Sequence, residues 1–306
     1  MELTAFRADR AASHPMNKDL KAVIDLLELE RLEDLIFRGQ SHDIGSPQVF
    51  GGQILGQALR AASSTVDQAS AHSLHAYFLR PGDFNLPVVY QVERSRDGRS
   101  YSNRRVVAIQ QGRPILNMAA SFHRFEQGFE HQVAMPEVAG PEGLAQSIEI
   151  NASMMDQVPE KMRRLLAHRP PFEFRPVEPP KFIEPGPRPP RKHIWMRAWD
   201  ALPDCDELHR TLLAYVSDYE LLGTATLPHA LDFASKAVQM ASIDHALWFH
   251  RPFRVDDWLL YAFDSPSSHS GRGFSRGEIF TRSGSLIASV AQEGVIRPWN
   301  PPQEQS

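Results

Sequence analysis

The chain has 306 residues, of which 42% are hydrophobic and 23% charged, a composition that suits a soluble globular protein with one large domain or two ordinary ones. Its formal net charge of -4 and its lack of a long basic run argue against a nucleic-acid partner held by phosphate neutralisation. Cys205 is the only cysteine and no run of about 18 apolar residues occurs, so the sequence excludes an internal disulfide, a multi-cysteine zinc site and a membrane-spanning helix.

The first part of the chain predicts two helices and then a series of strands. Residues 1–20 carry scattered charges and no apolar stretch of signal-peptide length, and no segment is apolar enough to span a membrane, so we expect a cytoplasmic protein. An amphipathic pattern predicts a helix over 17–35 that ends or turns near Arg31, and a second helix over 50–64 that opens on two glycines. Apolar–polar alternation between Pro-Gly, Asp-Gly and Gln-Gly turns then predicts strands over 73–81, 87–95, 101–111 and 113–123.

The middle of the chain lacks this regularity. Residues 136–170 are polar and partly helical in pattern, and residues 169–191 are dense in proline. Proline lacks an amide donor and disfavours helix in the residue before it, so this segment is predicted to be an extended linker. Phe172, Phe174 and Phe182 suggest that the linker lies against the protein surface.

The last third of the chain repeats the first at a fixed spacing. A predicted helix over 212–227 precedes strands predicted over 247–252, 258–265, 273–283 and 284–296. Arg80 matches Arg251 at an offset of 171 (251 − 80). The same offset, without a gap, aligns Tyr90 with Tyr261, Arg105 with Arg276 and Ala120 with Ala291. Upstream, an offset of 167 places Gly56 on Gly223, and together these matches indicate a duplicated unit.

Each predicted unit is one helix followed by a meander of antiparallel strands, which is an α+β arrangement. Two such units side by side can pair their sheets, which removes one exposed edge from each. We therefore predict an N-terminal unit over 17–135, a helical and proline-rich linker over 136–200, and a C-terminal unit over 201–300.

Four segments carry a specific resemblance to a known family. They occur in the family's order and spacing: QVFGGQILGQAL (48–59), HSLHAYFLRPGD (72–83), SIDHALWFHRPF (242–253) and RGFSRGEIFTRSGSLIASVAQEGVIR (272–297). Over nearly its whole length the chain resembles the bacterial acyl-CoA thioesterase II (TesB) family, whose members are double hotdog folds. The resemblance implies hydrolysis of acyl-coenzyme A without a cofactor or metal, by a homo-oligomer such as a dimer or tetramer.

The same resemblance assigns three residues to activation of the hydrolytic water. Asp218 matches the Asp of the family's A-x-x-S-D segment, Gln292 matches the Gln of its V-Q-E-G-like strand, and Ser242 precedes the I-D-H-x-x-W-F-H-R-P run where Thr is expected. A carboxylate can act as a general base, and an amide can position water or donate to developing charge. From the residues alone, Asp218 also fits a helix N-cap and Gln292 a solvated strand end.

Five further residues are assigned to substrate binding: Gly51, Gly52, His72, Arg80 and Arg251. Guanidinium groups suit the phosphates of coenzyme A, although a structural role fits arginines present in both repeats equally well. His72 and His75 are three apart on a predicted strand, so we expect them on opposite faces, where they do not share a metal.

The two units are not equivalent in these residues. The offsets place Ser121 at the position of Gln292 and Gly51 at the position of Asp218, so the N-terminal copy lacks both polar groups. We therefore expect one active site per chain, in a pocket between the units.

Two other functions fit the same sequence. One is a non-catalytic acyl-CoA binding hotdog protein, which has no need for a carboxylate combined with an amide. The other is an enoyl-CoA hydratase-type hotdog enzyme, which needs an Asp–His pair. Asp244 and His245 do not supply that pair, because neighbouring strand residues point to opposite faces. The acyl chain preference depends on pocket shape, which the sequence does not reveal.

Overall fold

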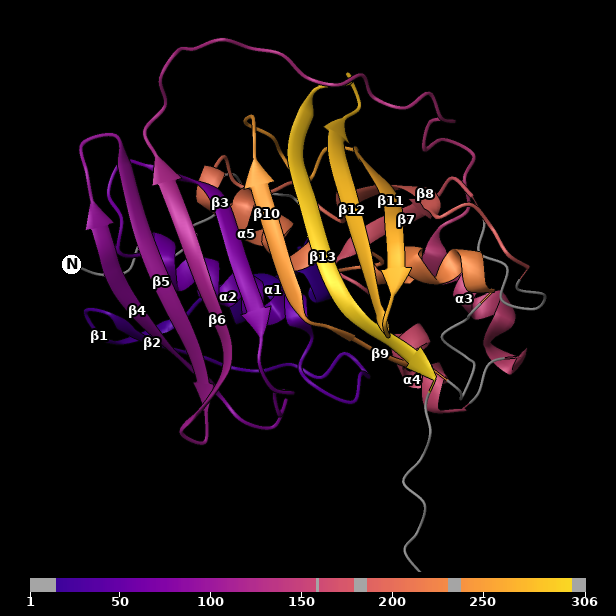
Figure 1. Cartoon of the computed structure of the whole chain (residues 1–306), viewed down its shortest axis with the longest axis horizontal. Coiled ribbons are helices and arrows are strands. Elements are labelled where there is room, and N and C mark those ends of the chain that lie inside the picture. The colour runs from indigo at the N-terminus through magenta and orange to yellow at the C-terminus, as the bar shows by residue number, and fades with distance from the viewer. Residues whose placement is uncertain (1–14, 158–159, 179–185, 231–237, 299–306) are drawn as a thin grey trace, which may run out of the picture.

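The protein is built on one large antiparallel sheet that carries helices on one face (Figure 1). The computed structural model describes residues 15–157, 160–178, 186–230 and 238–298. Within these ranges no helix has the length and apolar character needed to cross a bilayer.

The described residues contain five α-helices, two 3₁₀ helices and thirteen strands. The helices are α1 (Lys18–Leu27), α2 (Gly51–Ser63), α3 (Ser147–Met154), η1 (Met155–Gln157), α4 (Glu160–Ala167), α5 (Asp206–Val216) and η2 (Leu222–His229). The first six strands are β1 (Glu30–Glu33), β2 (Ile36–Gly39), β3 (Ser70–Phe78), β4 (Val88–Asp97), β5 (Tyr101–Gln110) and β6 (Arg113–His123). The others are β7 (Phe172–Pro176), β8 (Arg191–Ala198), β9 (Val238–Ser242), β10 (Asp244–Phe249), β11 (Leu259–His269), β12 (Arg272–Thr281) and β13 (Leu286–Pro298).

The sheet consists of two halves joined at their first long strands. The strand order is β1-β2-β4-β5-β6-β3-β10-β13-β12-β11-β8-β7, with β9 paired to β13. At the junction β3 and β10 run antiparallel, and His75 lies opposite Ala246. The order of strands is the same outward from this junction in both directions. The predicted α+β arrangement of two tandem units with paired sheets is therefore confirmed.

Two helices fill the inner face where the halves meet. Helix α2 comes from the N-terminal half and α5 from the C-terminal half, and they run antiparallel in close contact. Gly52 faces the carbonyl of Tyr215, because a Cβ at residue 52 would lie 2.1 Å from that oxygen. One turn further, Gly56 faces the carbonyl of Thr211. Glycine at residue 52 is what lets the two backbones approach this closely.

The outer face of the C-terminal half is covered by the chain that leaves β6. In Figure 1 this segment leaves the end of β6 and arches past the ends of the central strands toward the C-terminal half. The indole of Trp195 donates to the carbonyl of Ala139 at 2.8 Å, and Met135 and Val138 pack on a small apolar cluster around Trp195. The crossover between the halves is therefore held by packing against the sheet.

The predicted helix over 212–227 is wrong in its middle. Helix α5 ends at Val216, and a 3₁₀ segment, η2, follows after a turn. Glu220 adopts a left-handed backbone conformation with φ 65°, which an α-helix does not accommodate, and its carboxylate binds Lys192 at 2.6 Å. Because α5 lies N-terminal to this turn, Gly223 in η2 is not the structural counterpart of Gly56 in α2.

The predicted linker contributes strands to the sheet. Strand β7 pairs with β8, and β8 pairs with β11, although both lie within the range 136–200. The reason that β7 forms is that its apolar residues alternate with polar ones. Phe172 and Phe174 are both buried and place one face of the strand on the core. We therefore place the start of the C-terminal unit at β7. Phe182, which was expected at the surface with them, lies outside the described residues.

Candidate active site

A carboxylate and an amide from distant parts of the C-terminal half meet beneath the sheet. Asp218 follows α5, and its side chain is 7% exposed. Gln292 lies on the inner face of β13 and is 1% exposed. The Gln292 amide nitrogen donates to Oδ1 of Asp218 at 2.6 Å. Asp218 is therefore not the N-cap of an α-helix, and Gln292 is not at a solvated strand end.

The N-terminal half reaches the same carboxylate through the first turn of α2. The backbone amide of Gly52 donates a hydrogen bond to Asp218. At Gly51 a Cβ atom would lie 2.6 Å from Oδ2 of Asp218, so the space beside the carboxylate exists only with glycine there. The N-terminus of a helix carries partial positive charge, which favours an anion at this position. The site is thus shared between the two halves of the chain.

Ser242 completes the predicted group of three. It ends β9, opposite Gly294 of β13, and its hydroxyl hydrogen-bonds to Asp218. Three residues that are separated along the chain, Asp218, Ser242 and Gln292, therefore converge as the resemblance implied. Their convergence is a geometric finding, and their catalytic roles stay predictions.

The environment makes the Asp218 carboxylate more basic than an ordinary aspartate. Burial raises its pKa above the usual value, while hydrogen bonds from Gln292, Gly52 and Ser242 oppose that rise. The first effect dominates because the carboxylate is removed from water, which disfavours its charged form. A carboxylate of raised pKa binds a proton more readily, as a general base requires.

His245 is a buried member of this group that the sequence had suggested only as a partner of Asp244, a pairing that was rejected. It lies on the inner face of β10, 1% exposed, with Nδ1 3.2 Å from the amide nitrogen of Gln292 and Nε2 2.9 Å from the hydroxyl of Ser217. Asp244 points to the outer face and accepts from the amide of Glu293 at 2.6 Å, so these neighbours do diverge as predicted. The alternation of β10 was the available signal, since His245 shares its face with buried residues.

His245 is also near Asp218, at 3.9 Å between Nδ1 and Oδ1. Burial lowers the pKa of His245 to about 3, so the imidazole is neutral at neutral pH. The two side chains therefore do not form an ion pair.

The N-terminal half has apolar residues where these two polar side chains lie. Ser275 of β12 pairs with Gln292, and its repeat counterpart Arg104 of β5 pairs with Ala120. The counterpart of Gln292 is therefore Ala120, at an offset of 172. The predicted match of Gln292 to Ser121 is therefore wrong by one position, and so is that of Ala291 to Ala120.

The physical reason is one extra residue in the C-terminal hairpin turn. Three residues separate Thr281 from Ser285, whose carbonyl accepts from the Thr281 amide at 2.8 Å, whereas two residues separate the paired Gln110 and Arg113. Across the junction the offset of 171 holds, and it places Leu74 at the position of His245. Leu74 and Ala120 are both buried and apolar. The N-terminal half therefore lacks both the amide and the imidazole.

Three predicted substrate-binding residues lie apart from this group. Arg80 donates to the carbonyl of Pro114 at 2.7 Å, and Arg251 donates to the carbonyl of Leu286 at 2.9 Å. These two contacts are equivalent under the repeat, so they support the structural role that the sequence left open. His72 lies on the outer face, where its Nε2 is 2.8 Å from the hydroxyl of Ser121.

The prediction that His72 and His75 point to opposite faces is wrong. The register of β3 against β6 shifts between Ala71 and Ser73, and this bulge brings both histidines to the outer face. Within the described ranges, no three His, Cys, Asp or Glu side chains are placed to hold a metal ion.

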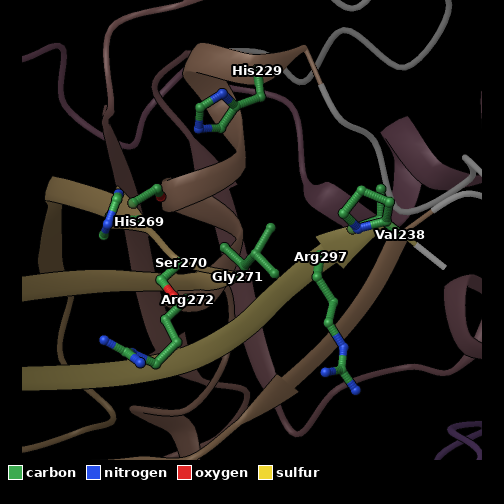
Figure 2. Close-up of a pocket in the computed structure, with 10 residues that line it drawn as sticks. His229, Val238, His269, Ser270, Gly271, Arg272 and Arg297 are labelled. Carbon is green, nitrogen blue, oxygen red and sulfur yellow. The ribbon is translucent and has the colours of Figure 1, made fainter.

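Two surface pockets lie elsewhere in the C-terminal half. One, of about 530 Å³, lies between η2 and the ends of β12 and β13, with Arg272 and Arg297 at its edge (Figure 2). Both arginines are already engaged, with Glu293 and Gln239 respectively. The other, of about 700 Å³, includes Arg254.

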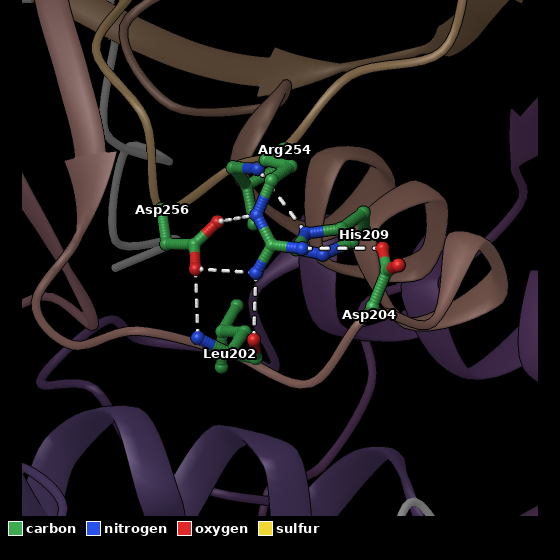
Figure 3. Close-up of polar contacts among 6 residues, drawn as sticks. Leu202, Asp204, His209, Arg254 and Asp256 are labelled. Carbon is green, nitrogen blue, oxygen red and sulfur yellow. Dashed lines mark hydrogen bonds and ion pairs between the residues drawn. The ribbon is translucent and has the colours of Figure 1, made fainter. Parts of the chain in front are cut away.

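Arg254 has its hydrogen-bonding groups occupied (Figure 3). It binds Asp256 at 2.9 Å, Asp204 at 3.2 Å and the carbonyl of Leu202 at 2.6 Å. Asp218, Ser242 and Gln292 line neither pocket. The buried polar group and the surface pockets are therefore separate features.

Comparisons with known proteins agree on one family. Residues 168–295 match the acyl-CoA thioesterase family model, and residues 38–123 match the model for the acyl-CoA thioesterase N-terminal domain. The chain is 41% identical to acyl-CoA thioesterase 2 of Haemophilus influenzae, over 92% of this chain and 99% of that protein.

Solved structures give the same answer. The acyl-CoA thioesterase II TesB2 of Mycobacterium marinum superposes with a TM-score of 0.74 at 40% identity, over 92% of this chain and 99% of that one. A hot dog fold protein of unknown function from Alicyclobacillus acidocaldarius superposes with a TM-score of 0.71 at 18% identity, over 92% and 98% of the two chains. The latter likeness shows the fold alone, and together they confirm the double hotdog prediction.

Proposed function

The chain belongs to the acyl-CoA thioesterase family, and from that premise we propose that it hydrolyses acyl-coenzyme A to a free fatty acid and coenzyme A through water activated by Asp218. The observation that carries this proposal is the buried contact between Asp218 and Gln292, at 2.6 Å. Burying a carboxylate is costly, and the hydrogen bonds to Asp218 offset that cost only in part, since its pKa stays raised. A carboxylate held in this state is suited to act as a general base.

The proposed reaction needs one proton acceptor and one water. Asp218 removes a proton from the water as its oxygen attacks the thioester carbonyl carbon, and a tetrahedral oxyanion forms. The carbon–sulfur bond then breaks, and the proton held by Asp218 passes to the leaving thiolate. The products are a carboxylic acid and coenzyme A, so atoms and charges balance without a cofactor.

Gln292 and Ser242 are proposed to orient that water, because both contact the carboxylate that receives its proton. Orientation of this kind lowers the barrier by replacing a random encounter with a fixed approach. The partial positive charge at the first turn of α2, beside Gly51 and Gly52, is suited to stabilise the developing oxyanion. These two glycines are thus proposed to form the wall against which the thioester lies.

The hydratase alternative is less well supported. Asp218 and His245 are 3.9 Å apart, which is the kind of pair that chemistry requires. Both ring nitrogens of His245, however, already face Gln292 and Ser217, which leaves neither available to a substrate. A non-catalytic binder has no use for a buried carboxylate of raised pKa.

The direct test is release of free thiol from acyl-coenzyme A substrates of graded chain length, with an enoyl-coenzyme A hydration assay on the same preparation. We expect thiol release from each acyl-coenzyme A whose chain length the enzyme accepts, and no hydration of enoyl-coenzyme A. Hydration without thiol release would support the alternative enzyme, and binding without either would support the binding protein. The length that is cleaved fastest reports the acyl preference.

A cytoplasmic location and a homo-oligomeric assembly, as a dimer or tetramer, stay proposals from the sequence and the family. Cell fractionation tests the first. Light scattering on the purified chain tests the second.

A further inference from the structure

The orientation of the Gln292 side chain is fixed by two acceptors. An ionised carboxylate only accepts hydrogen bonds, so the Gln292 atom 2.6 Å from Asp218 is the amide nitrogen. The second proton of that nitrogen faces Nδ1 of His245 at 3.2 Å. With both protons used, Gln292 has only its carbonyl oxygen, Oε1, left to offer.

The acceptor at His245 depends on its tautomer. Nδ1 accepts only if the neutral ring carries its proton on Nε2. Nε2 lies 2.9 Å from the hydroxyl of Ser217, and that hydroxyl lies 3.0 Å from the carbonyl of Ala214. The carbonyl accepts the Ser217 proton, so the Ser217 oxygen is available to accept from Nε2. These hydrogen bonds form a series from Ala214 through Ser217 to His245, and each one fixes the direction of the next.

The remaining oxygen of Gln292 is buried and has no hydrogen-bond partner among the described residues. A buried carbonyl oxygen without a donor is costly, and native structures rarely leave one unsatisfied. A water molecule beside Asp218 is the matching donor, because it can give one proton to the carboxylate and the other to Oε1.

We propose that His245 is a positioning residue that holds the Gln292 carbonyl oxygen toward the hydrolytic water. One hydrogen bond, to Asp218, decides which end of the amide faces the carboxylate but leaves the amide free to rotate about that contact. The second, to His245, fixes its plane. Gln292 then acts as an acceptor for water and has no proton left for an oxyanion. The inference rests on the proposed hydrolase function.

The comparison of the two halves supports this reading. The N-terminal half has Leu74 in place of His245 and Ala120 in place of Gln292, as the strand registers show. Imidazole and amide occur together in the half that carries the carboxylate and are absent together from the other half.

The test compares two substitutions at one position. His245→Leu removes the acceptor with little change in volume, whereas the carboxamide oxygen of His245→Asn lies about where Nδ1 was. We expect His245→Leu to lower kcat by about 10–100-fold, the usual loss when a partner behind a functional residue is removed, with little change in KM. His245→Asn is expected to recover much of that loss. His250→Leu, on the outer face beside Ser289, is the matched control and is expected to keep wild-type kcat.

Melting temperatures of all three variants separate folding from positioning. Equal losses of kcat in the Leu and Asn variants, or an unchanged kcat in His245→Leu, would overturn the proposal.

A second measurement does not depend on activity. Nitrogen-15 spectra of histidine-labelled wild-type protein, assigned by the signal lost in His245→Asn, should show His245 protonated on Nε2 and not on Nδ1. The signal should stay unchanged from neutral pH down to about pH 5. A proton on Nδ1 would refute the positioning role even in an active enzyme. Failure of the wild-type protein to release thiol would instead refute the proposed function, and the spectra would still test the hydrogen-bond chain.

Discussion

The backbone of Gly51 passes so close to Asp218 that a Cβ atom at residue 51 would lie 2.6 Å from the carboxylate oxygen Oδ2. This contact joins the first turn of a helix in the N-terminal half to the turn that follows the equivalent helix in the C-terminal half. The space beside the carboxylate is therefore set by both halves of the chain.

Gly51→Ala should impair catalysis more than folding. The added methyl group must push Asp218 or Phe78 away, and displacement of about 1 Å at a reacting group can lower the rate by about 100-fold. Steady-state kinetics and thermal melting measure the two effects. Gly56→Ala is the control on the same helix, since its Cβ meets the flexible end of Leu27, and it should leave kcat near wild type. Equal kcat in both variants would contradict the proposed role of this space.

Asp218→Asn should nearly abolish turnover. The carboxamide keeps the shape of the side chain but accepts no proton at neutral pH, so kcat should fall by about 100–10,000-fold, the range typical of general-base loss. Stopped assays with excess enzyme measure the residual rate. A variant that retains most of its kcat would show that the carboxylate is structural.

The same substitution should not reduce stability at neutral pH. Burial raises the pKa of Asp218 in the folded state, so its contribution to stability is favourable below the unfolded pKa and is lost as pH rises. At neutral pH the charged carboxylate is buried, which costs free energy, and a neutral amide in its place removes that cost. We expect the melting temperature of Asp218→Asn relative to wild type to increase from acidic to neutral pH, and a decrease would indicate that the carboxylate is stabilised when charged.

The pH dependence of kcat/KM should report the same carboxylate. A general base works only when ionised, so the rate should fall as pH drops through its pKa, which lies above the ordinary aspartate value of 3.8. His245, with a pKa of about 3, should add no step between neutral pH and that limb. An acid limb below 3.8, or a step near the ordinary histidine pKa, would contradict this assignment.

Each chain should bind one molecule of a tight, non-hydrolysable acyl-coenzyme A analogue. Only the C-terminal half carries the amide and imidazole, because Leu74 and Ala120 occupy their positions in the other half. Titration calorimetry gives the stoichiometry directly. Two sites per chain would mean that the N-terminal half forms a binding site by other residues.

Activity should survive a chelator and the substitution Cys205→Ala. The proposed reaction uses neither a metal nor a thiol, and Cys205 lies at the start of α5, at the other end of that helix from Asp218. The check is kcat before and after each treatment. Strong loss in either experiment would leave thioester hydrolysis possible but refute the water-activation mechanism.

The sequence predicted much of this protein because the deciding features were local or repeated. Alternation located eight long strands, the helix over 50–64 was found from its apolar face, and the repeat predicted two paired sheets. The family motifs named Asp218, Ser242 and Gln292, which the structure brings together. Short strands with little alternation, such as β1 and β2, were missed because they have too few residues to show a period.

Tertiary structure decided which residues share the site and which face each one occupies. One extra residue in a hairpin turn shifts a whole strand against its repeat, and a bulge in β3 moves His72 to the outer face. Neither shift leaves a clear mark on composition or periodicity. Each nevertheless matters, because side chains alternate along a strand and a single inserted residue moves those beyond it to the opposite face. The role inferred for His245 likewise depends on contacts with Gln292 and Ser217, which lie 47 and 28 residues away along the chain and meet only through the fold.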